Sequence, residues 1–93
     1  MSDDDRPVLR IRPGATAWSA AGDEAVVLDL QRSTYVGLNE TASLLWQRLV
    51  GGTTRDDLVE ALLAEYDVSG DTARAEVDAF VADLSRRGYL IGA

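Results

Sequence analysis

The sequence contains no cysteine, no histidine and no lysine, so all nine of its basic residues are arginines. Without cysteine the chain has no disulfide, no thiol nucleophile and no thiolate metal site. Without histidine it lacks the commonest general base and the commonest metal ligand. Without lysine it has neither a Schiff-base amine nor the phosphate-binding lysine of a P-loop. These absences favour a binding protein over an enzyme, and we expect no catalytic residue, no metal and no cofactor.

Positive charge and long apolar runs are also scarce. Sixteen acidic residues against nine basic ones give a net charge of −7. Such a chain repels a phosphate backbone, whereas nucleic-acid binding normally needs a basic surface. No apolar run reaches the roughly 18–20 residues that span a bilayer. The acidic start, Met1 to Asp5, is not a signal peptide. We therefore expect a cytoplasmic protein that binds neither nucleic acid nor a membrane.

The length of 93 residues predicts one domain, and the chain is 46% apolar and 27% charged, an ordinary globular balance. Its first few residues hold a run of three aspartates with no apolar neighbour, which is typical of a frayed terminus. We expect residues 1–6 to form a disordered acidic N-terminus and residues 7–93 to form a single domain.

The part of the chain before Asn39 favours strands. Residues 8–12 alternate between apolar and polar side chains, which is typical of a half-buried strand. Residues 24–30 are rich in strand-forming residues, with Val26, Leu28 and Leu30 on one face and Val27 and Asp29 on the other. Residues 14–22 are small and loop-like, although Ala17 and Trp18 could extend a strand. A tight turn at residues 31–32 then leads into a strand at 33–38. These patterns predict a three-stranded antiparallel meander of 8–12, 24–30 and 33–38, with the third strand at its edge.

After Asn39 the apolar period becomes helical. We expect helices from about residue 41 to 50, from 53 or 54 to about 66, and from about 71 to 88, with 89–91 as a short extended tail. Asn39 or Thr41 can cap the first helix, and Thr54 can cap the second. The fold class is α+β: a three-stranded antiparallel sheet followed by three helices, resembling a winged helix-turn-helix.

Paired carboxylates are the remaining candidates for acid–base chemistry. Asp56 with Glu60, and Asp78 with Asp83, lie about one helical turn apart. A catalytic pair needs burial that separates the two pKa values. Both pairs fall on the polar faces of amphipathic helices, which favours solvated surface charge.

The expected edge strand gives the most informative functional hypothesis. Residues 34–38 carry neither the charges nor the proline that usually protect a sheet edge, and Gly37 leaves room beside the backbone. Such an edge invites an added strand from another chain. If the last helix runs along this edge, its apolar stripe would wall a groove. The alternative is that the stripe belongs to the core; it consists of Val77, Phe80, Val81 and Leu84.

Four blocks of sequence resemble the PqqD-like family, a group of small proteins named for a pyrroloquinoline quinone biosynthesis protein. The blocks are Val-Val-Leu-Asp at 26–29, Tyr-Val-Gly-Leu-Asn-Glu-Thr-Ala at 35–42, Leu-Trp at 45–46 and Gly-Gly-Thr-Thr at 51–54. The similarity extends over about residues 8–91. Members of this family bind the leader segment of a ribosomally made precursor peptide and present it to a processing enzyme.

In the family the leader adds as a strand beside the third strand, in a groove against the third helix. The resemblance therefore implies a peptide-binding site on the strand at 33–38 and the helix at 73–87. The residues it assigns to the site are Leu28, Leu30, Ser33, Thr34, Tyr35, Val36, Gly37, Leu38, Val77, Phe80, Val81, Leu84 and Arg87.

A stand-alone acidic member without lysine or cysteine resembles the recognition subunit of lasso-peptide biosynthesis. In those systems the leader peptidase is a separate chain of cysteine-protease type, and leaders tend to carry a Tyr-x-x-Pro-x-Leu segment. The implied partners are thus the leader of a precursor peptide and such a peptidase. The alternative reading is a winged-helix protein–protein adaptor, or a transcription-related domain, with no leader-peptide role.

Overall fold

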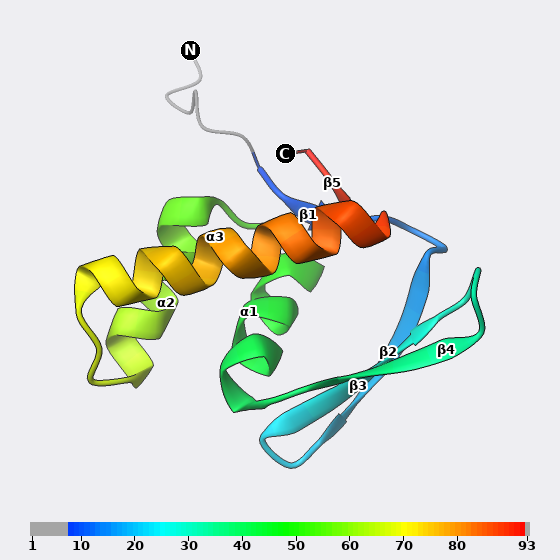
Figure 1. The fold of residues 1–93 in the computed structure, drawn as a ribbon, viewed down its shortest axis with the longest axis horizontal. Coiled ribbons are helices and arrows are strands. Elements are labelled where there is room, and N and C mark those ends of the chain that lie inside the picture. The colour runs from blue at the N-terminus through cyan, green and yellow to red at the C-terminus, as the bar shows by residue number, and fades with distance from the viewer. Residues whose placement is uncertain (1–7, 93) are drawn as a thin grey trace.

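The computed structural model describes residues 8–92, which form five strands and three helices (Figure 1). The expected acidic N-terminus, residues 1–6, lies outside this range. In chain order the elements are β1 (Arg10–Ile11), β2 (Thr16–Ala21), β3 (Glu24–Asp29), β4 (Thr34–Leu38), α1 (Glu40–Val50), α2 (Arg55–Glu65), α3 (Gly70–Arg87) and β5 (Leu90–Ile91).

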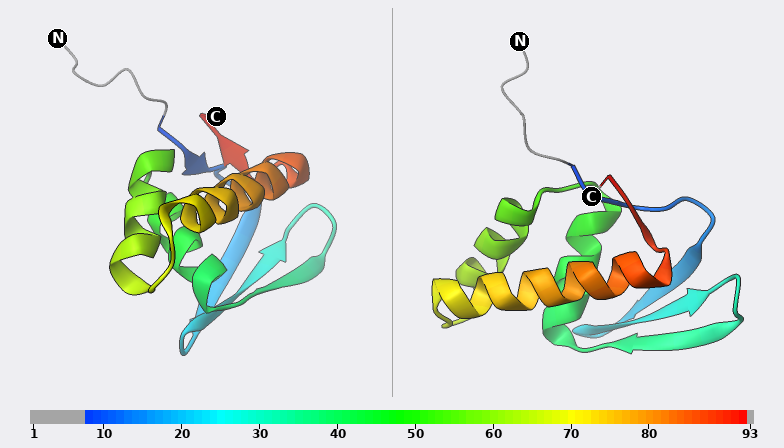
Figure 2. Two further views of the ribbon diagram at one scale, coloured as in Figure 1. Left: turned by 60° about the vertical axis from the view of Figure 1, so that its left-hand side comes forward. Right: turned by 45° about the horizontal axis from the view of Figure 1, so that its top comes forward.

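The three-stranded sheet is antiparallel throughout, in the order β2-β3-β4. The helices follow it along the chain, so the predicted α+β class is confirmed. Helix α1 packs on β3 and β4, and α3 crosses over α1 (Figures 1 and 2). β4 lies at one edge of the sheet, as predicted, and β2 lies at the other.

The predicted first strand of this sheet is wrong. β2 occupies that place, with Trp18 opposite Val27, while β1 pairs with β5 in a separate two-stranded sheet. The side chain of Leu9 is buried in the core, and its backbone exchanges two hydrogen bonds with Thr53. The alternating pattern of residues 8–12 thus reflects burial against the helices. A two-residue turn at Gly22 and Asp23 joins β2 to β3, and Gly22 has φ +65° there.

The turn between β3 and β4 is longer than the sequence predicts. Asp29 pairs with Thr34, so Leu30 and Ser33 lie in the turn and not in the strands. The Asp29 carboxylate accepts hydrogen bonds from the backbone N–H groups of Gln31 (3.0 Å) and Arg32 (2.9 Å). An aspartate that binds the backbone two residues on is a typical turn former. It therefore ends the strand before Leu30.

The three helices begin within about a residue of the positions predicted from the sequence, and each begins directly after its capping residue. Asn39, Thr54 and Ser69 each accept a hydrogen bond from the backbone N–H three residues ahead. Gly88 ends α3 in the left-handed conformation, with φ +82°, which favours glycine. The tail after α3 is extended as expected and forms β5.

The core lies between the three helices and the inner face of the sheet. Trp46 is completely buried and meets the ring of Tyr89 edge-on, with ring centroids 6.4 Å apart. The inner face of β3 carries Ala25, Val27 and Asp29, whereas Val26 and Leu28 share the outer face. No helix within residues 8–92 is long and apolar enough to cross a membrane.

Candidate functional site

β4 presents an open strand edge. One side of it pairs with β3, and no strand within residues 8–92 covers the other side. Its five residues include no charge and no proline, and no atom lies within 4 Å of a Cβ built at Gly37. Natural edge strands are usually protected by charge, proline or a covering element. This edge therefore remains available for an added strand.

Helix α3 presents a mixed stripe of side chains toward one end of β4. Glu76, Phe80 and Asp83 follow one another at helical spacing and share a face. Together with Ala79 they form one wall of a cavity of about 310 Å³. The other wall is the start of α1, from Asn39 to Leu45. Because Asn39 directly follows the last residue of β4, this cavity opens at the end of the strand.

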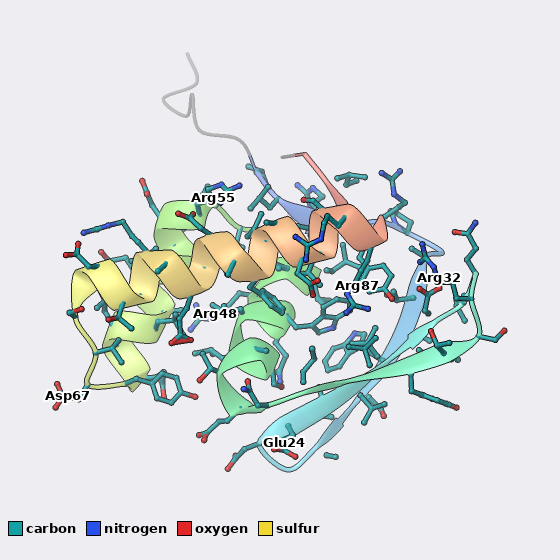
Figure 3. All side chains as sticks on the ribbon, in the orientation of Figure 1. Glu24, Arg32, Arg48, Arg55, Asp67 and Arg87 are labelled. Atoms are coloured by element: carbon teal, nitrogen blue, oxygen red, sulfur yellow. The ribbon has the colours of Figure 1, made fainter. Side chains whose placement is uncertain are left out.

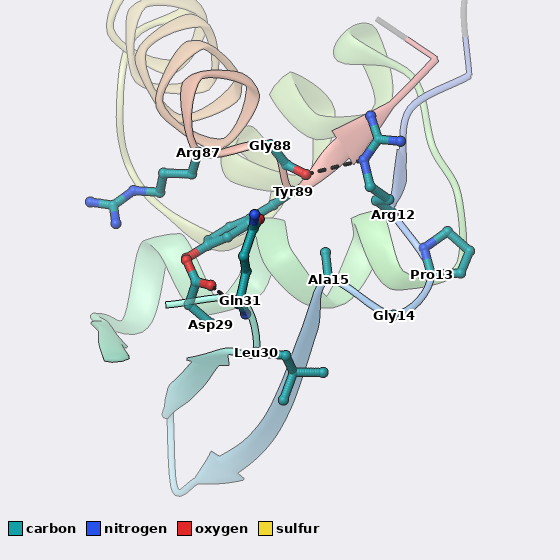
Figure 4. Close-up of a pocket in the computed structure, with 10 residues that line it drawn as sticks. All are labelled: Arg12, Pro13, Gly14, Ala15, Asp29, Leu30, Gln31, Arg87, Gly88 and Tyr89. Atoms are coloured by element: carbon teal, nitrogen blue, oxygen red, sulfur yellow. Dashed lines mark hydrogen bonds between the residues drawn. The ribbon is translucent and has the colours of Figure 1, made fainter. Parts of the chain in front are cut away.

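A second cavity, of about 550 Å³, lies at the end of the sheet where β4 begins, since its lining residue Asp29 pairs with Thr34 (Figure 4). Its lining comes from the turn after β3, from the C-terminal end of α3 and from the link between β1 and β2. Arg12, Leu30, Arg87 and Tyr89 are among its residues. The two cavities lie toward opposite ends of β4, although no β4 residue lines either of them, and each has α3, or the residues just after it, as one wall.

The Asp29 carboxylate joins the two walls of the site. It accepts hydrogen bonds from the Tyr89 hydroxyl at 2.7 Å and from the Arg32 guanidinium at 2.9 Å, besides those from the turn backbone. The backbone N–H of Arg32 contributes most, and the Tyr89 hydroxyl next, to lowering the pKa of Asp29 to about 2. Burial, and then the bond to Asp29, raise the pKa of Tyr89. Asp29 is therefore an ionised buried carboxylate that accepts hydrogen bonds from the turn backbone, from Arg32 and from Tyr89.

Sequence reasoning missed this pair. The signal that could have found it is a single aspartate on the buried face of an alternating strand, next to Val27. A buried charge needs partners, and that requirement points to a donor from a distant element. Nothing local in the sequence identifies Tyr89 as the donor.

The strand residues predicted for the site occupy three different environments. Val36 and Leu38 face inward; Val36 is half-buried against the core and Leu38 is buried. Tyr35 lies on the outer face opposite Leu28 and is 73% exposed. Thr34 and Gly37 are exposed on β4. Their contact with a peptide stays a prediction.

Several of the expected groove residues need correction. Val77, Val81 and Leu84 are at most 3% exposed and belong to the core, so they do not wall an open groove. Leu28 lies on the outer face of the sheet, away from the helices, because it pairs with Tyr35. Leu30 and Ser33 lie in the turn, outside β4.

Phe80 and Arg87 are the predicted α3 residues that reach the surface of the site. Phe80 is half-buried, packs against the core and lines the first cavity. Arg87 lines the second cavity and pairs with Asp83, which raises the pKa of the guanidinium. Figure 3 shows Arg32 and Arg87 near the same end of the site. The sequence reasoning did not single out Ala42 or Glu76, which also line the first cavity.

No group of three or more acidic side chains within residues 8–92 is arranged to hold a metal ion. Asp71, Asp78 and Asp83 of α3 instead pair with arginines, whereas Glu76 has no ion pair within residues 8–92. Asp78 binds Arg55 of α2 at 2.9 Å, and Asp83 binds Arg86 and Arg87. These pairs have the character of surface ion pairs.

Comparisons with known proteins identify relatives of this fold and sequence. The sequence pattern of the PqqD family, described as coenzyme PQQ synthesis protein D, matches residues 24–90. One similar solved structure is TbiB1 in complex with the TbiA(beta) leader peptide. It is 32% identical, with a TM-score of 0.82, and the match covers 90% of this chain and 96% of that one.

A second similar structure is a lasso peptide synthetase B1 complexed with the leader peptide. It is 31% identical to this chain, with a TM-score of 0.77, and the match covers 89% of this chain and 96% of the other. A comparison with curated protein sequences gave no match. The match to the family pattern spans well over half of the chain and includes β3, β4 and all three helices.

Proposed function

The chain belongs to the PqqD family, and on that premise we propose that it binds the leader segment of a ribosomally made precursor peptide. The bound leader adds as a strand to β4 and lies against α3. The chain then delivers the leader to a separate leader peptidase of lasso-peptide biosynthesis. The observation that carries this proposal is the open, uncharged edge of β4, with a cavity walled by α3 and the start of α1 at the end of the strand.

Strand addition suits this edge chemically. Backbone N–H and C=O groups along β4 supply affinity without requiring a particular leader sequence. At about 3.3 Å per residue, the five residues of β4 pair with a segment roughly 16 Å long. Side chains that alternate inward along that segment reach Phe80 and the apolar floor at Ala42 and Leu45. With one or two such anchors we expect a dissociation constant between about micromolar and high nanomolar.

The solved relatives support the binding role. TbiB1 and the lasso peptide synthetase B1 are both seen with a leader peptide, and each is at least 31% identical to this chain over nearly its whole length. The absence of histidine, cysteine and lysine fits a chain that binds its substrate and leaves cleavage to another subunit. We infer a peptidase of cysteine-protease type as that subunit from the lasso-peptide resemblance.

The test of strand addition uses the synthetic leader peptide of the precursor gene beside this chain's gene. Its backbone amides are methylated one at a time, which removes a donor and adds bulk without changing any side chain. In a β-ladder each strand directs alternate N–H groups to its neighbour. We expect fluorescence anisotropy to show weaker binding at every second residue over about five residues. Uniform or absent effects would contradict strand addition, and no binding by the unmodified leader would contradict the proposed function.

A cleavage assay with the purified peptidase and the precursor peptide tests delivery. We expect the peptidase to cleave the precursor faster in the presence of this chain, and the acceleration to disappear with an amide-methylated precursor that no longer binds. Cleavage at an equal rate without this chain would contradict the delivery role while leaving leader binding intact.

A further inference from the structure

The two ends of the site carry opposite charge. At the end where β4 meets α1, Glu76 and Asp83 line the cavity, and no basic residue does. Because Asp83 is paired with Arg86 and Arg87, the unbalanced negative charge at this end is that of Glu76. Glu76 is exposed, and its carboxylate forms no ion pair within residues 8–92. A free carboxylate beside the apolar surface of Phe80 and Leu45 favours a side chain with an apolar stem and a cationic head.

Arginines gather at the other end. Arg12 and Arg87 line the second cavity, Arg32 binds Asp29, and Arg86 binds Asp83. Of these four arginines, Arg32 pairs with Asp29, and Arg86 and Arg87 share Asp83, so this end has a local excess of positive charge. Arg12 has no ion pair within the described residues; it donates to the carbonyls of Gly88 and Leu90. In a chain with net charge −7, this concentration stands out.

The spacing of the two ends matches an extended peptide. Glu76 and Arg87 are eleven residues apart on α3, which corresponds to roughly 16 Å at about 1.5 Å per residue. An extended strand covers that distance in about five residues, the length of β4. A leader segment paired along β4 therefore passes from one charged end to the other.

We propose that this charge polarity fixes the direction and register of the bound leader. The inference rests on the proposed leader-binding function and adds a class of ligand to it. The leader segment carries a basic residue that meets Glu76 and, four or six residues away so that both side chains face α3, an acidic residue that meets Arg87. Backbone pairing alone permits a two-residue slip or a reversed strand, since neither moves the alternating side chains to the other face. Opposite charges at the two ends penalise both errors.

The experiment measures binding of the leader peptide of the neighbouring precursor gene by fluorescence anisotropy. The protein variants are Glu76→Arg, Arg87→Glu and the double variant. Glu60→Arg on α2 and Arg74→Glu on α3 are the matched controls, because each makes the same charge change at an exposed position that lines neither cavity. A second peptide has its basic and acidic residues, those four or six positions apart, exchanged.

We expect each single variant to weaken binding of the natural leader about three- to tenfold, since exposed pairs become repulsive. For the charge-exchanged leader the order reverses: the double variant should bind it more tightly than the unaltered protein does, by a factor of the same size. The effect shrinks at 0.5 M salt because exposed charges are screened. Melting curves accompany every variant, and Glu76→Gln with Arg87→Gln replace any reversal that fails to fold.

Three results would overturn the inference while leaving the proposed function intact: losses no larger than those of the controls, no recovery with the exchanged peptide, or a natural leader that binds tightly and has no such charge pair. Failure of the unaltered protein to bind any leader would contradict the proposed function itself. Titration of the unaltered protein with the natural leader thus distinguishes failure of the charge-polarity inference from failure of the proposed function.

Discussion

The Tyr89 hydroxyl donates a 2.7 Å hydrogen bond to Oδ2 of Asp29, although the two residues are 60 positions apart in the chain. Asp29 ends β3 and shapes the turn into β4, while Tyr89 directly follows α3 and its cap Gly88. One hydrogen bond therefore connects the two elements between which the leader is proposed to lie. It sets the separation of α3 from the β3–β4 hairpin at the basic end of the site.

Removing this bond is expected to destabilise the fold. In Tyr89→Phe the ring remains against Trp46, but the buried carboxylate loses a donor. Hydrogen bonds to charged groups contribute about 1.5–3 kcal/mol, so the free energy of unfolding in urea should fall by about that amount. Tyr35→Phe removes a hydroxyl from a side chain that is 73% exposed and should change the stability by less than about 0.5 kcal/mol. Equal effects of the two changes would contradict a structural role for the bond.

The same carboxylate predicts a dependence of stability on pH. Its pKa is about 2 in the folded protein, below the ordinary value of 3.8. A group whose folded pKa is lowered adds stability above its unfolded pKa and loses that contribution as the pH falls through the folded value. The stability difference between the natural protein and Asp29→Asn should therefore be full above about pH 4 and narrow toward pH 2. Unfolding curves that stay equally far apart over this range would contradict the assignment.

A charge placed on the inner face of β4 should block the site. Val36 is half-buried beside the core, and an aspartate there would lie next to the inward-facing side chains of the added leader strand. We expect Val36→Asp to weaken leader binding at least about tenfold, because a buried unpaired charge is costly. Ser19→Asp adds the same charge to β2, the opposite edge of the sheet, and should bind normally. If only Ser19→Asp weakened leader binding, the leader would pair with β2 and not with β4, which would contradict the proposed site.

Phe80 tests the wall of the first cavity. It is half-buried on α3 and lines the cavity with the start of α1. Phe80→Ala removes the largest apolar surface there and should weaken leader binding. A fully buried phenylalanine costs about 3–5 kcal/mol when truncated to alanine, so a melting curve must show that the variant is folded at the titration temperature. Phe80→Leu keeps an apolar side chain and should retain most of the affinity. If folded Phe80→Ala bound the leader normally, Phe80 would not be part of the leader-binding groove.

The features that short stretches of sequence determine, such as helix starts and the change from strands to helices, were predicted correctly from the sequence. Asn39 and Thr54 mark the starts of α1 and α2 because their side chains cap the helix N-termini. The change from a two-residue to a helical period after Asn39 correctly separates sheet from helices. Because Thr34–Leu38 contains no charge and no proline, this edge strand is left open to pairing with another strand.

Pairings between distant segments could not be read in the same way. Leu9 and Ile11 alternate like strand residues, but burial against the helices produces the same pattern as a sheet face. β2 is poor in β-branched residues, so its identity depends on pairing with β3, and its best local signal is the Gly22-Asp23 turn. Val77 and Phe80 belong to one apolar stripe, yet only the packing of α1 and α2 decides that Val77 is buried and that Phe80 lines the site.

The measurement that tests the central claim most directly is a backbone amide NMR titration of the ¹⁵N-labelled protein with the synthetic leader peptide of the neighbouring precursor gene. The account predicts saturable shifts that are largest on Thr34–Leu38 and on the α3 face around Phe80, with cross-strand NOEs between β4 and the peptide. Saturable shifts centred on β2 or on α2, without NOEs to β4, would contradict strand addition at β4.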